Sequence, residues 1–433
     1  MRRFLVLAWL AFLAGPGLAA SVAQPPVEWT HFRFDEKHTG RQPFETKLNP
    51  DTIRSAGPLW QGELNGELVD YSSPAVAGGF VYIGNVDGQL VVYPADGCGA
   101  EFCGQPAWRS TNLAQIMDSP TVVNGIVYVG SQSSQDSNDG KLNAFDAAGC
   151  GQAVCAPLWQ GDAGTESILQ SSPVVWKGLV FVGSFGGKLF AFDADGCGRQ
   201  LCRPVWTGIL GGATESTPVV FKGVVYVGAD DGKLYAFNAK GCGKKNCAPL
   251  WTGALQGSAL ASSPAIYKSK IYIGGQHGLS VFDASGCGQA SCAPLWQTTD
   301  GDNFFGGSPA IAGGRVYLPE ESQIDVYDAD GCGQAMCPTK AILFGSGMQD
   351  GIASSPTVAN GVVYAGRNSG EVLAWRADCK GLCDEIWKGF TDDPIVSSSP
   401  SVVNGKIYVG GSDHGFSGRL YVFGLGGPSE KRR

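Results

Sequence analysis

The sequence has few of the residues from which many enzyme active sites are built. It contains four histidines and four methionines among 433 residues, and the histidines form no cluster. It has neither a Gly-x-Ser-x-Gly nucleophile motif nor a phosphate-binding Gly-x-x-x-x-Gly-Lys-Ser/Thr motif. Adjacent cysteines and a Cys-x-x-Cys-His haem motif are also absent. The sequence therefore offers no recognisable catalytic or haem-binding motif.

Positive charge and long apolar runs are scarce as well. The formal net charge is −8, which argues against a nucleic-acid-binding surface. Phe4–Leu13 is apolar but too short to span a bilayer, and it follows Arg2 and Arg3. We therefore expect a signal peptide at residues 1–23, with an uncleaved anchor as the alternative. The mature chain is then secreted or periplasmic, has no transmembrane segment and is monomeric.

A repeated unit fills most of the remaining sequence. In Ser216–Trp251, short apolar runs at Val224–Val227, Leu234–Phe237 and Pro249–Trp251 follow a first run after Pro218, which indicates four short strands. Each unit starts with a Ser/Thr-Pro pair, whose prolines are Pro74, Pro120, Pro173, Pro218, Pro264, Pro309, Pro356 and Pro400. Starts 44 to 53 residues apart with four strands each are typical of propeller blades.

The fold class expected from this repeat is an all-β, eight-bladed β-propeller with four-stranded antiparallel blades. The last unit lacks a fourth strand, whereas Leu59–Gln61 resembles a fourth strand without a preceding unit. We therefore expect Leu59–Gln61 to pair with Leu420–Phe423 and to close the ring. The predicted division is a lead segment at 24–56, the propeller at 57–425 and a polar tail at 426–433. In blade six, we expect Phe344 to occupy the position at which other blades carry a tryptophan.

The Ser/Thr-Pro pairs are predicted to be structural. The first strand of a blade lines the central channel, and proline is tolerated at such a strand start or edge because it has no N–H. A serine or threonine at the same place in every blade fits a structural role better than a catalytic one.

The fourteen cysteines form seven local pairs in the loops between third and fourth strands. An even count at regular spacing after an export signal predicts disulfides. Zinc is the alternative, but each loop offers only two thiols and no nearby histidine. The predicted pairs are Cys98–Cys103, Cys150–Cys155, Cys197–Cys202, Cys242–Cys247, Cys287–Cys292, Cys332–Cys337 and Cys379–Cys383.

The blade that contains Ala191, Asp193, Gly196 and Trp206 resembles the repeat of the pyrroloquinoline-quinone (PQQ) propeller superfamily, and the resemblance covers about residues 57–424. It implies that each tryptophan docks on the alanine and the glycine peptide of a neighbouring blade. In this chain the interval from Ala191 to Trp206 is fifteen residues, five more than in the superfamily motif, and the cysteine loop occupies the extra length.

The resemblance also implies two functions. Quinoprotein dehydrogenases of this superfamily use PQQ and calcium and commonly have adjacent cysteines, which this sequence lacks. The propeller of outer-membrane assembly factors instead has the same blade number and acts as a scaffold. We therefore expect a binding or scaffold module that needs no cofactor, rather than an enzyme. The alternative is a PQQ- and calcium-dependent dehydrogenase acting on alcohols or polymers.

The candidate ligand site is the acidic mouth of the channel. Loops that join fourth strands to the next first strands carry many carboxylates, and Arg109 is their only basic residue. Such a mouth would attract a cation, a basic partner protein or a polar ligand, although solvated charge is the simpler interpretation. Whether a metal binds is left open. The candidate residues closest to the first strands are Asp118, Glu215, Asp302, Asn303 and Asp350.

Overall fold

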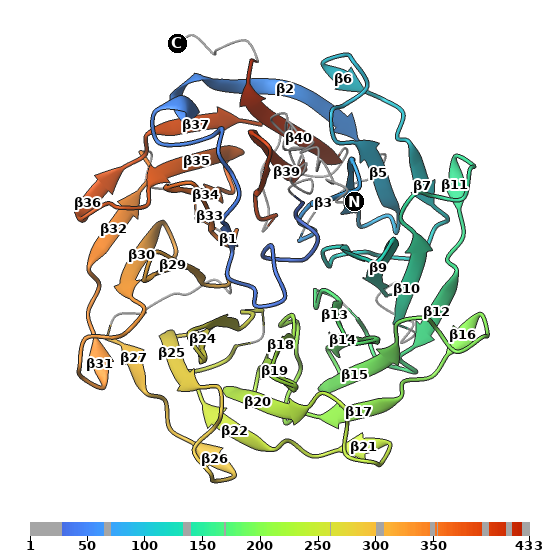
Figure 1. The fold of residues 1–433 in the computed structure, drawn as a ribbon, viewed down its shortest axis with the longest axis vertical. Coiled ribbons are helices and arrows are strands. Elements are labelled where there is room, and N and C mark those ends of the chain that lie inside the picture. The colour runs from blue at the N-terminus through green and yellow to red at the C-terminus, as the bar shows by residue number, and fades with distance from the viewer. Residues whose placement is uncertain are drawn as a thin grey trace, which may run out of the picture.

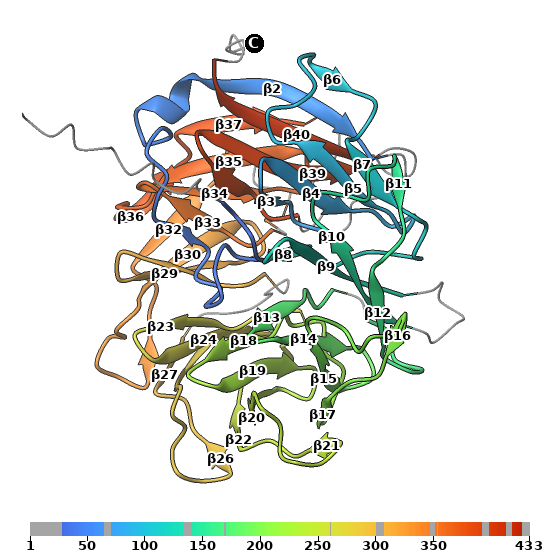
Figure 2. The same ribbon diagram turned by 45° about the vertical axis from the view of Figure 1, so that its right-hand side comes forward.

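The computed structural model describes residues 28–64, 71–132, 140–168, 170–259, 261–299, 307–346, 351–352, 354–391, 398–412 and 418–426. Eight small sheets surround a central axis, and the lead segment crosses the centre of the ring (Figure 1). Figure 2 shows the same ring of blades turned by 45° about the vertical axis. Within the described part of the chain, no helix has the length and apolar character needed to cross a membrane.

Each blade contributes four strands, from the axis outwards. The first strands are β3 (Ala75–Ala77), β8 (Thr121–Val123), β13 (Val174–Trp176), β18 (Val219–Phe221), β23 (Ala265–Tyr267), β28 (Ala310–Ala312), β33 (Thr357–Ala359) and β38 (Ser401–Val403). The second strands are β4 (Phe80–Gly84), β9 (Ile126–Ser131), β14 (Leu179–Ser184), β19 (Val224–Ala229), β24 (Lys270–Gly275), β29 (Arg315–Pro319), β34 (Val362–Gly366) and β39 (Lys406–Ser412).

The two outer strands complete each blade. The third strands are β5 (Leu90–Pro94), β10 (Lys141–Asp146), β15 (Lys188–Asp193), β20 (Lys233–Asn238), β25 (Gly278–Asp283), β30 (Gln323–Asp328), β35 (Glu371–Arg376) and β40 (Gly418–Leu425). The fourth strands are β7 (Trp108–Ser110), β12 (Trp159–Asp162), β17 (Trp206–Ile209), β22 (Trp251–Ala254), β27 (Trp296–Thr298), β32 (Ala341–Phe344), β37 (Trp387–Phe390) and β2 (Ala56–Glu63).

The ring closes as the sequence predicts. Strand β2, near the start of the chain, pairs antiparallel with β40, near its end, and Trp60 lies opposite Val422 while Gly62 lies opposite Leu420. The eighth blade is therefore built from both ends of the propeller, so that no sheet edge separates the first blade from the last.

The sheets have five strands rather than the predicted four. In seven blades the fifth strand is a short parallel strand from the disulfide loop of the following blade. These strands are β6 (Phe102–Cys103), β11 (Val154–Cys155), β16 (Leu201–Cys202), β21 (Asn246–Cys247), β26 (Ser291–Cys292), β31 (Met336–Cys337) and β36 (Gly381–Asp384). In blade seven the fifth strand is β1 (Arg41–Gln42), which lies at the inner edge and pairs parallel with β33.

The extra strands have a simple physical cause. A disulfide closes each loop into a hairpin that projects over the fourth strand of the preceding blade. The hairpin then accepts a backbone hydrogen bond, such as that from Thr207 N to Lys245 O at 2.7 Å. Donors at the outer edge of the sheet are satisfied by the neighbouring blade instead of by water. All seven predicted disulfides are present, and no cysteine is free.

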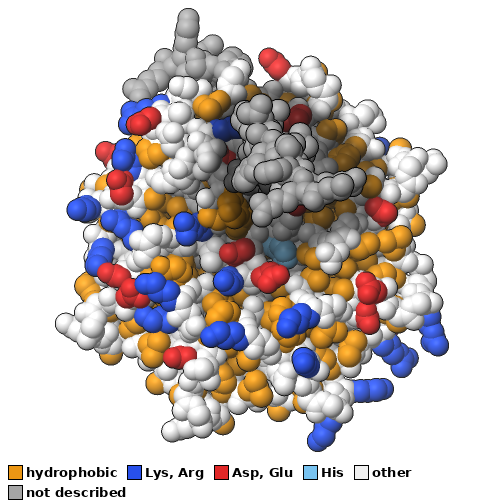
Figure 3. All heavy atoms as spheres, viewed as in Figure 1, with side chains coloured by type: hydrophobic (Ala, Val, Ile, Leu, Met, Phe, Trp, Pro, Cys, Tyr) orange, Lys and Arg blue, Asp and Glu red, His pale blue; other side chains and the backbone are white. Residues whose placement is uncertain are grey.

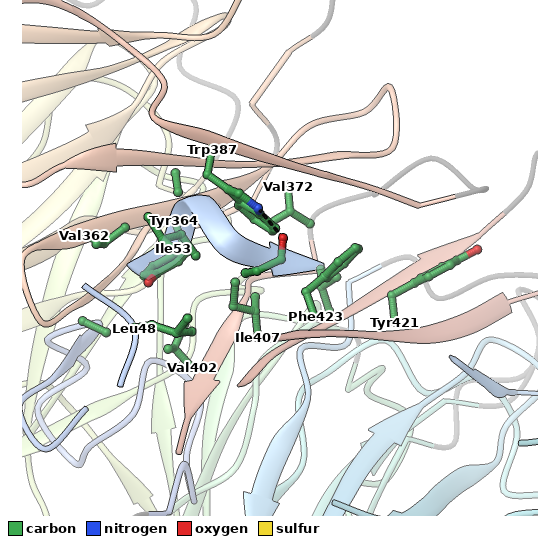
Figure 4. Close-up of a cluster of buried hydrophobic side chains, with 14 residues drawn as sticks. Leu48, Ile53, Val362, Tyr364, Val372, Trp387, Val402, Ile407, Tyr421 and Phe423 are labelled. Carbon is green, nitrogen blue, oxygen red and sulfur yellow. Dashed lines mark hydrogen bonds between the residues drawn. The ribbon is translucent and has the colours of Figure 1, made fainter. Parts of the chain in front are cut away.

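The hydrophobic core lies between neighbouring blades. Trp159 of blade two packs on Gly196 of blade three, where the glycine has a φ of 77° and an added Cβ would meet the indole ring at 2.8 Å. This is the tryptophan docking that the superfamily resemblance implies. At the junction of blades seven and eight, Trp387 instead donates from Nε1 to Ala56 O at 3.0 Å, beside the 3-10 helix η1 (Thr52–Ser55) (Figure 4).

The expectation that Phe344 replaces the repeated tryptophan is wrong. Val326 pairs with Ala341, just as Ala236 pairs with Trp251, so Ala341 occupies the tryptophan position. Trp375 of the next blade is fully buried in the same cluster as Ala341. Its Nε1 donates to Phe344 O at 2.6 Å, so an indole from the neighbouring blade fills this junction.

Candidate functional site at the central channel

A closed ring of hydrogen bonds surrounds the channel. In every blade, the backbone N–H of the serine or threonine that precedes the first-strand proline donates to the hydroxyl of the equivalent residue in the next blade. The hydroxyl positions are confirmed as structural, because each one joins two blades. The eight bonds run from Ser73 to Ser119 (2.9 Å), Ser119 to Ser172 (2.9 Å), Ser172 to Thr217 (3.0 Å), Thr217 to Ser263 (2.9 Å), Ser263 to Ser308 (3.0 Å), Ser308 to Ser355 (2.8 Å), Ser355 to Ser399 (3.1 Å) and Ser399 to Ser73 (2.9 Å).

A second position, two residues before each proline, ties the first strand to the second. In six blades a serine hydroxyl there accepts from the N–H of a second-strand glycine, as Ser216 does from Gly228 at 3.2 Å. In blade two this residue is Asp118, whose Oδ2 accepts from Gly130 N at 2.6 Å. Asp118 is 1% exposed, and its Oδ1 has no hydrogen-bond partner among the described residues. Burial therefore raises its pKa well above the ordinary value of an aspartate.

The lead segment lies inside the ring and closes one mouth. It takes hydrogen bonds from the inner edges of first strands in blades one, two, five, six and seven. Glu28 accepts from Gly78 N, and Glu45 accepts from Gly405 N, both in turns that follow first strands. The closed mouth is therefore opposite the acidic loops, which precede first strands. The bonds to inner edges are Val76 N to Trp29 O, Val122 N to Thr30 O, Ile266 N to Lys37 O, Ile311 N to Thr39 O and Val358 N to Gly40 O.

The lead segment buries three basic side chains. Arg33 donates to Pro309 O and to Pro356 O, each at 2.7 Å, and burial lowers its pKa to about 9. Burial lowers the pKa of His31 to about 4. Burial, followed by the charges of His31 and Arg33, lowers the pKa of His38 to about 3. Both histidines are therefore neutral in the folded protein at neutral pH.

Sequence reasoning missed this segment because it has no periodicity. Its only signal is a group of aromatic residues, Trp29, Phe32, Phe34 and Phe44, among polar ones. The structure shows that Trp29 and Phe34 pack edge to face, with ring centroids 5.4 Å apart. No sequence pattern indicated that the arginine between them would enter the channel.

The mouth with the acidic loops carries a pair of carboxylates. Glu215 is partly buried, and burial, followed by the charge of Asp230, raises its pKa to about 7. Asp230 also accepts from the hydroxyl of Ser258 at 2.6 Å. Nearby, Glu166 forms an ion pair with Lys188 at 2.5 Å. In the described part of the chain, no three His, Cys, Asp or Glu side chains are placed to hold one metal ion.

Of the five residues predicted for the mouth, the structure describes two. Asp118 lies at the channel wall, one position before the serine ring, and Glu215 lies in the loop before β18. The predicted residues Asp302, Asn303 and Asp350 lie outside the described residues, as do the signal peptide at 1–23 and most of the polar tail. Whether these five residues form one site stays a prediction.

The sequence matches a known protein family. A family model described as outer membrane protein assembly factor BamB matches residues 46–201 and 155–318. Together the two matches run from residue 46 to residue 318, which is more than half of the 433 residues. The chain belongs to this family. No curated protein matches the sequence.

Solved structures of BamB-like and quinoprotein type share the fold of this BamB-family chain. BamB from Moraxella catarrhalis is 15% identical with a TM-score of 0.62, over 85% of this chain and 99% of that chain. Quinohemoprotein alcohol dehydrogenase from Comamonas testosteroni is 13% identical with a TM-score of 0.68, over 94% and 82%. A europium-containing methanol dehydrogenase is 12% identical with a TM-score of 0.66, over 93% and 99%.

The described residues of the channel do not suit PQQ. PQQ is a polyanion, whereas the acidic mouth presents Glu215 and Asp230, and Asp118 is buried in the wall. The channel arginine, Arg33, is 2% exposed and already donates to two backbone carbonyls of the ring. The disulfides join cysteines four or five residues apart, and none joins adjacent cysteines. We therefore derive no chemistry from this cofactor.

Proposed function

We propose that this BamB-family propeller is a secreted or periplasmic binding module that holds a basic segment of a partner protein at its acidic mouth. The observation that carries the proposal is the asymmetry of the channel. The lead segment occupies one mouth, whereas the other is bordered by Glu215 and Asp230 and by loops with few basic residues. Lys188 and Lys233 are paired with Glu166 and Asp231, so the negative charge of Glu215 and Asp230 remains to attract a basic partner.

The comparisons support this role more than an enzymatic one. The matched family is described as an assembly factor, which is a protein-binding function. The seven disulfides suit a compartment outside the cytoplasm. The hydroxyls of the serine ring are already engaged between blades, which leaves them in a structural role.

A synthetic Lys/Arg-rich peptide tests the proposal. Calorimetry should show binding that strengthens as the pH rises through about 7, because Glu215 gains its charge there. Glu215→Gln combined with Asp230→Asn should weaken binding about tenfold. Asp193→Asn combined with Asp195→Asn, both on exposed side chains outside the mouth, is the control. Binding that ignores the mouth variant, or no binding at low salt, would refute the proposal.

The dehydrogenase alternative rests on the fold shared with quinoprotein dehydrogenases. Incubation with PQQ and Ca²⁺, followed by absorbance and dye reduction with alcohols, separates the two functions. The binding-module proposal expects no dye reduction above that of free PQQ. Substrate-dependent reduction would establish the alternative.

A further inference from the structure

A cavity of about 470 Å³ lies between the lead segment and blades six and seven. Its walls are β1 and the residues that follow it, the turns after β28 and β33, and the end of β35. The volume is in the range of small-molecule sites. The cavity is separate from the acidic mouth, because the turns that border it follow the first strands, whereas the acidic loops precede them.

The side chains around this cavity are rich in cations and hydrogen-bond donors. Three arginines line it, from three different elements: Arg41 of β1, Arg315 of β29 and Arg376 of β35. The acidic lining residues are Glu45 and Asp378, so the lining carries a net charge of +1 in a chain of net charge −8. The cavity therefore attracts anions locally, against the charge of the whole molecule.

The two acids are already engaged. Glu45 is 4% exposed, and its carboxylate accepts from three backbone N–H groups, those of Lys47 (2.7 Å), Leu48 (3.1 Å) and Gly405 (2.9 Å). Asp378 forms two hydrogen bonds with Arg376 at 3.0 and 3.3 Å, and both side chains are about half exposed or more. Neither acid is arranged to receive a cation.

Gln42 supplies an independent sign of a ligand. The residue is 1% exposed, and its Oε1 accepts from Phe44 N at 3.1 Å. Its Nε2 is buried and has no hydrogen-bond acceptor among the described residues. A buried amide donor without an acceptor destabilises the fold, so its presence beside the arginines indicates a group that accepts from it.

The fixed part of the site is Arg315. Its guanidinium donates to Ala377 O at 3.1 Å and Cys379 O at 2.5 Å, which holds it against the hairpin of blade seven. It therefore contributes charge without moving, while the exposed side chain of Arg41 is available to close on a ligand. Arg376 can add its Nη1, which takes no part in its pair with Asp378. Arginine pairs well with the planar oxygens of carboxylate and phosphate groups.

We propose that this cavity binds a small organic anion with a carboxylate or phosphate group. Arg41 and Arg376 contact the anion, the amide of Gln42 donates to it, and Arg315 adds fixed positive charge. Pro43 and Ala312 supply apolar walls for the carbon skeleton of the ligand. The site depends on the lead segment, because Arg41 and Gln42 reach the cavity only when β1 pairs with β33.

Calorimetry of the full chain at low ionic strength tests this assignment with citrate, inorganic phosphate and pyrophosphate. Binding of citrate alone identifies a carboxylate site, and binding of the phosphates identifies a phosphate site. Arg41→Gln and Arg376→Gln should each raise the dissociation constant about tenfold. Both side chains are exposed, so both variants should fold. Lys244→Gln with Lys245→Gln, on the exposed hairpin of blade four, is the matched control.

Gln42→Leu separates a ligand site from a structural one. The change removes the unpaired Nε2 donor but also the acceptor of Phe44 N, so stability to urea should change little, whereas binding should weaken about tenfold. The proposal is overturned if none of the three anions binds with a dissociation constant below about 10 mM. It is also overturned if the arginine variants bind as the wild type does, or no more weakly than the lysine control.

Discussion

At the scale of single residues, the channel wall shows how one substitution departs from a repeated pattern. Six blades place a serine where blade two has Asp118, and all of these side chains accept from a second-strand glycine. The serine is neutral, so it is buried at little cost. A carboxylate has one more oxygen, and Oδ1 of Asp118 finds no donor among the described residues. The native structure therefore favours the protonated acid.

Asp118→Ser should stabilise the protein more at pH 7 than at pH 4. The raised pKa means that the native protein keeps a proton that the unfolded chain has lost above about pH 4. Wild-type stability consequently falls as the pH rises from the unfolded pKa towards the folded one. Urea unfolding at the two pH values measures the difference, with the exposed Asp87→Ser as control. A difference that stays constant or shrinks with pH would contradict this account.

At the scale of elements, the disulfide hairpins act between blades rather than within them. Each hairpin covers the fourth strand of the preceding blade, and in six of the seven the second cysteine is buried, as Cys247 is at 3% exposure. Blade eight supplies no such hairpin, and the outer strand of blade seven, β37, is the last strand of its sheet in the described structure. The disulfides therefore stabilise the interfaces that join the ring.

Removal of one disulfide should loosen one outer edge. In the double variant Cys242→Ser with Cys247→Ser, the hairpin loses about 2 kcal/mol of the stabilisation that loop closure by the disulfide provides. The amide of Thr207, which donates to Lys245 O, should exchange about ten- to thirtyfold faster with deuterium. The amide of Thr252 donates to Ala290 O under an intact hairpin and is the internal control. Equal exchange changes at both amides would show that the hairpin does not act locally.

The elements were predictable because they repeat. Ser/Thr-Pro pairs, paired cysteines and docking tryptophans recur at one spacing, so blade number, disulfides and ring closure through β2 followed from the sequence. The fifth strands did not, since two to four residues carry no strand pattern and the partner strand of most of them lies in another blade. The sequence did not indicate that Ala341 rather than Phe344 occupies the tryptophan position of blade six, because the indole at this junction is that of Trp375 in the next blade.

The same limit applies to the candidate sites. Carboxylates in loops before first strands could be assigned to one mouth from topology alone. The cavity beside β1 could not, because Arg41 and Gln42 reach it through a parallel pairing of only two residues. Their cationic partners, Arg315 of blade six and Arg376 of blade seven, are distant in sequence, and no spacing in the sequence relates them.

At the scale of the whole molecule, the lead segment connects blades that are distant in sequence. It hydrogen-bonds to the first strands of five blades, and Arg33 joins blades six and seven through their proline carbonyls. Figure 3 shows basic, acidic and hydrophobic side chains mixed over the surface in the view along the axis. Because of these hydrogen bonds, the lead segment acts as a plug in the channel, and its stability there is coupled to the stability of the eight-bladed ring.

This plug should be sensitive to acid. His31 and His38 are buried and neutral, the charges of His31 and Arg33 act on His38, and the half-buried Asp35 acts on Arg33. Their folded pKa values of about 4 and about 3 lie below the unfolded value of 6.5. The unfolded chain therefore binds more protons between these values. The stability that the two neutral histidines contribute is fully present above pH 6.5 and is lost as the pH falls below that value.

Between pH 7.5 and pH 5 the loss should be on the order of 2 kcal/mol for each histidine. Urea unfolding across this range measures it, and deuterium exchange of the Val122 and Ile266 amides reports on the plug itself. His31→Asn with His38→Asn should flatten the pH dependence, whereas His277→Asn, at an exposed position, should leave it as in the wild type. If the double variant keeps the wild-type pH slope, the acid sensitivity does not arise from the buried histidines, and the carboxylates of the ring become its source.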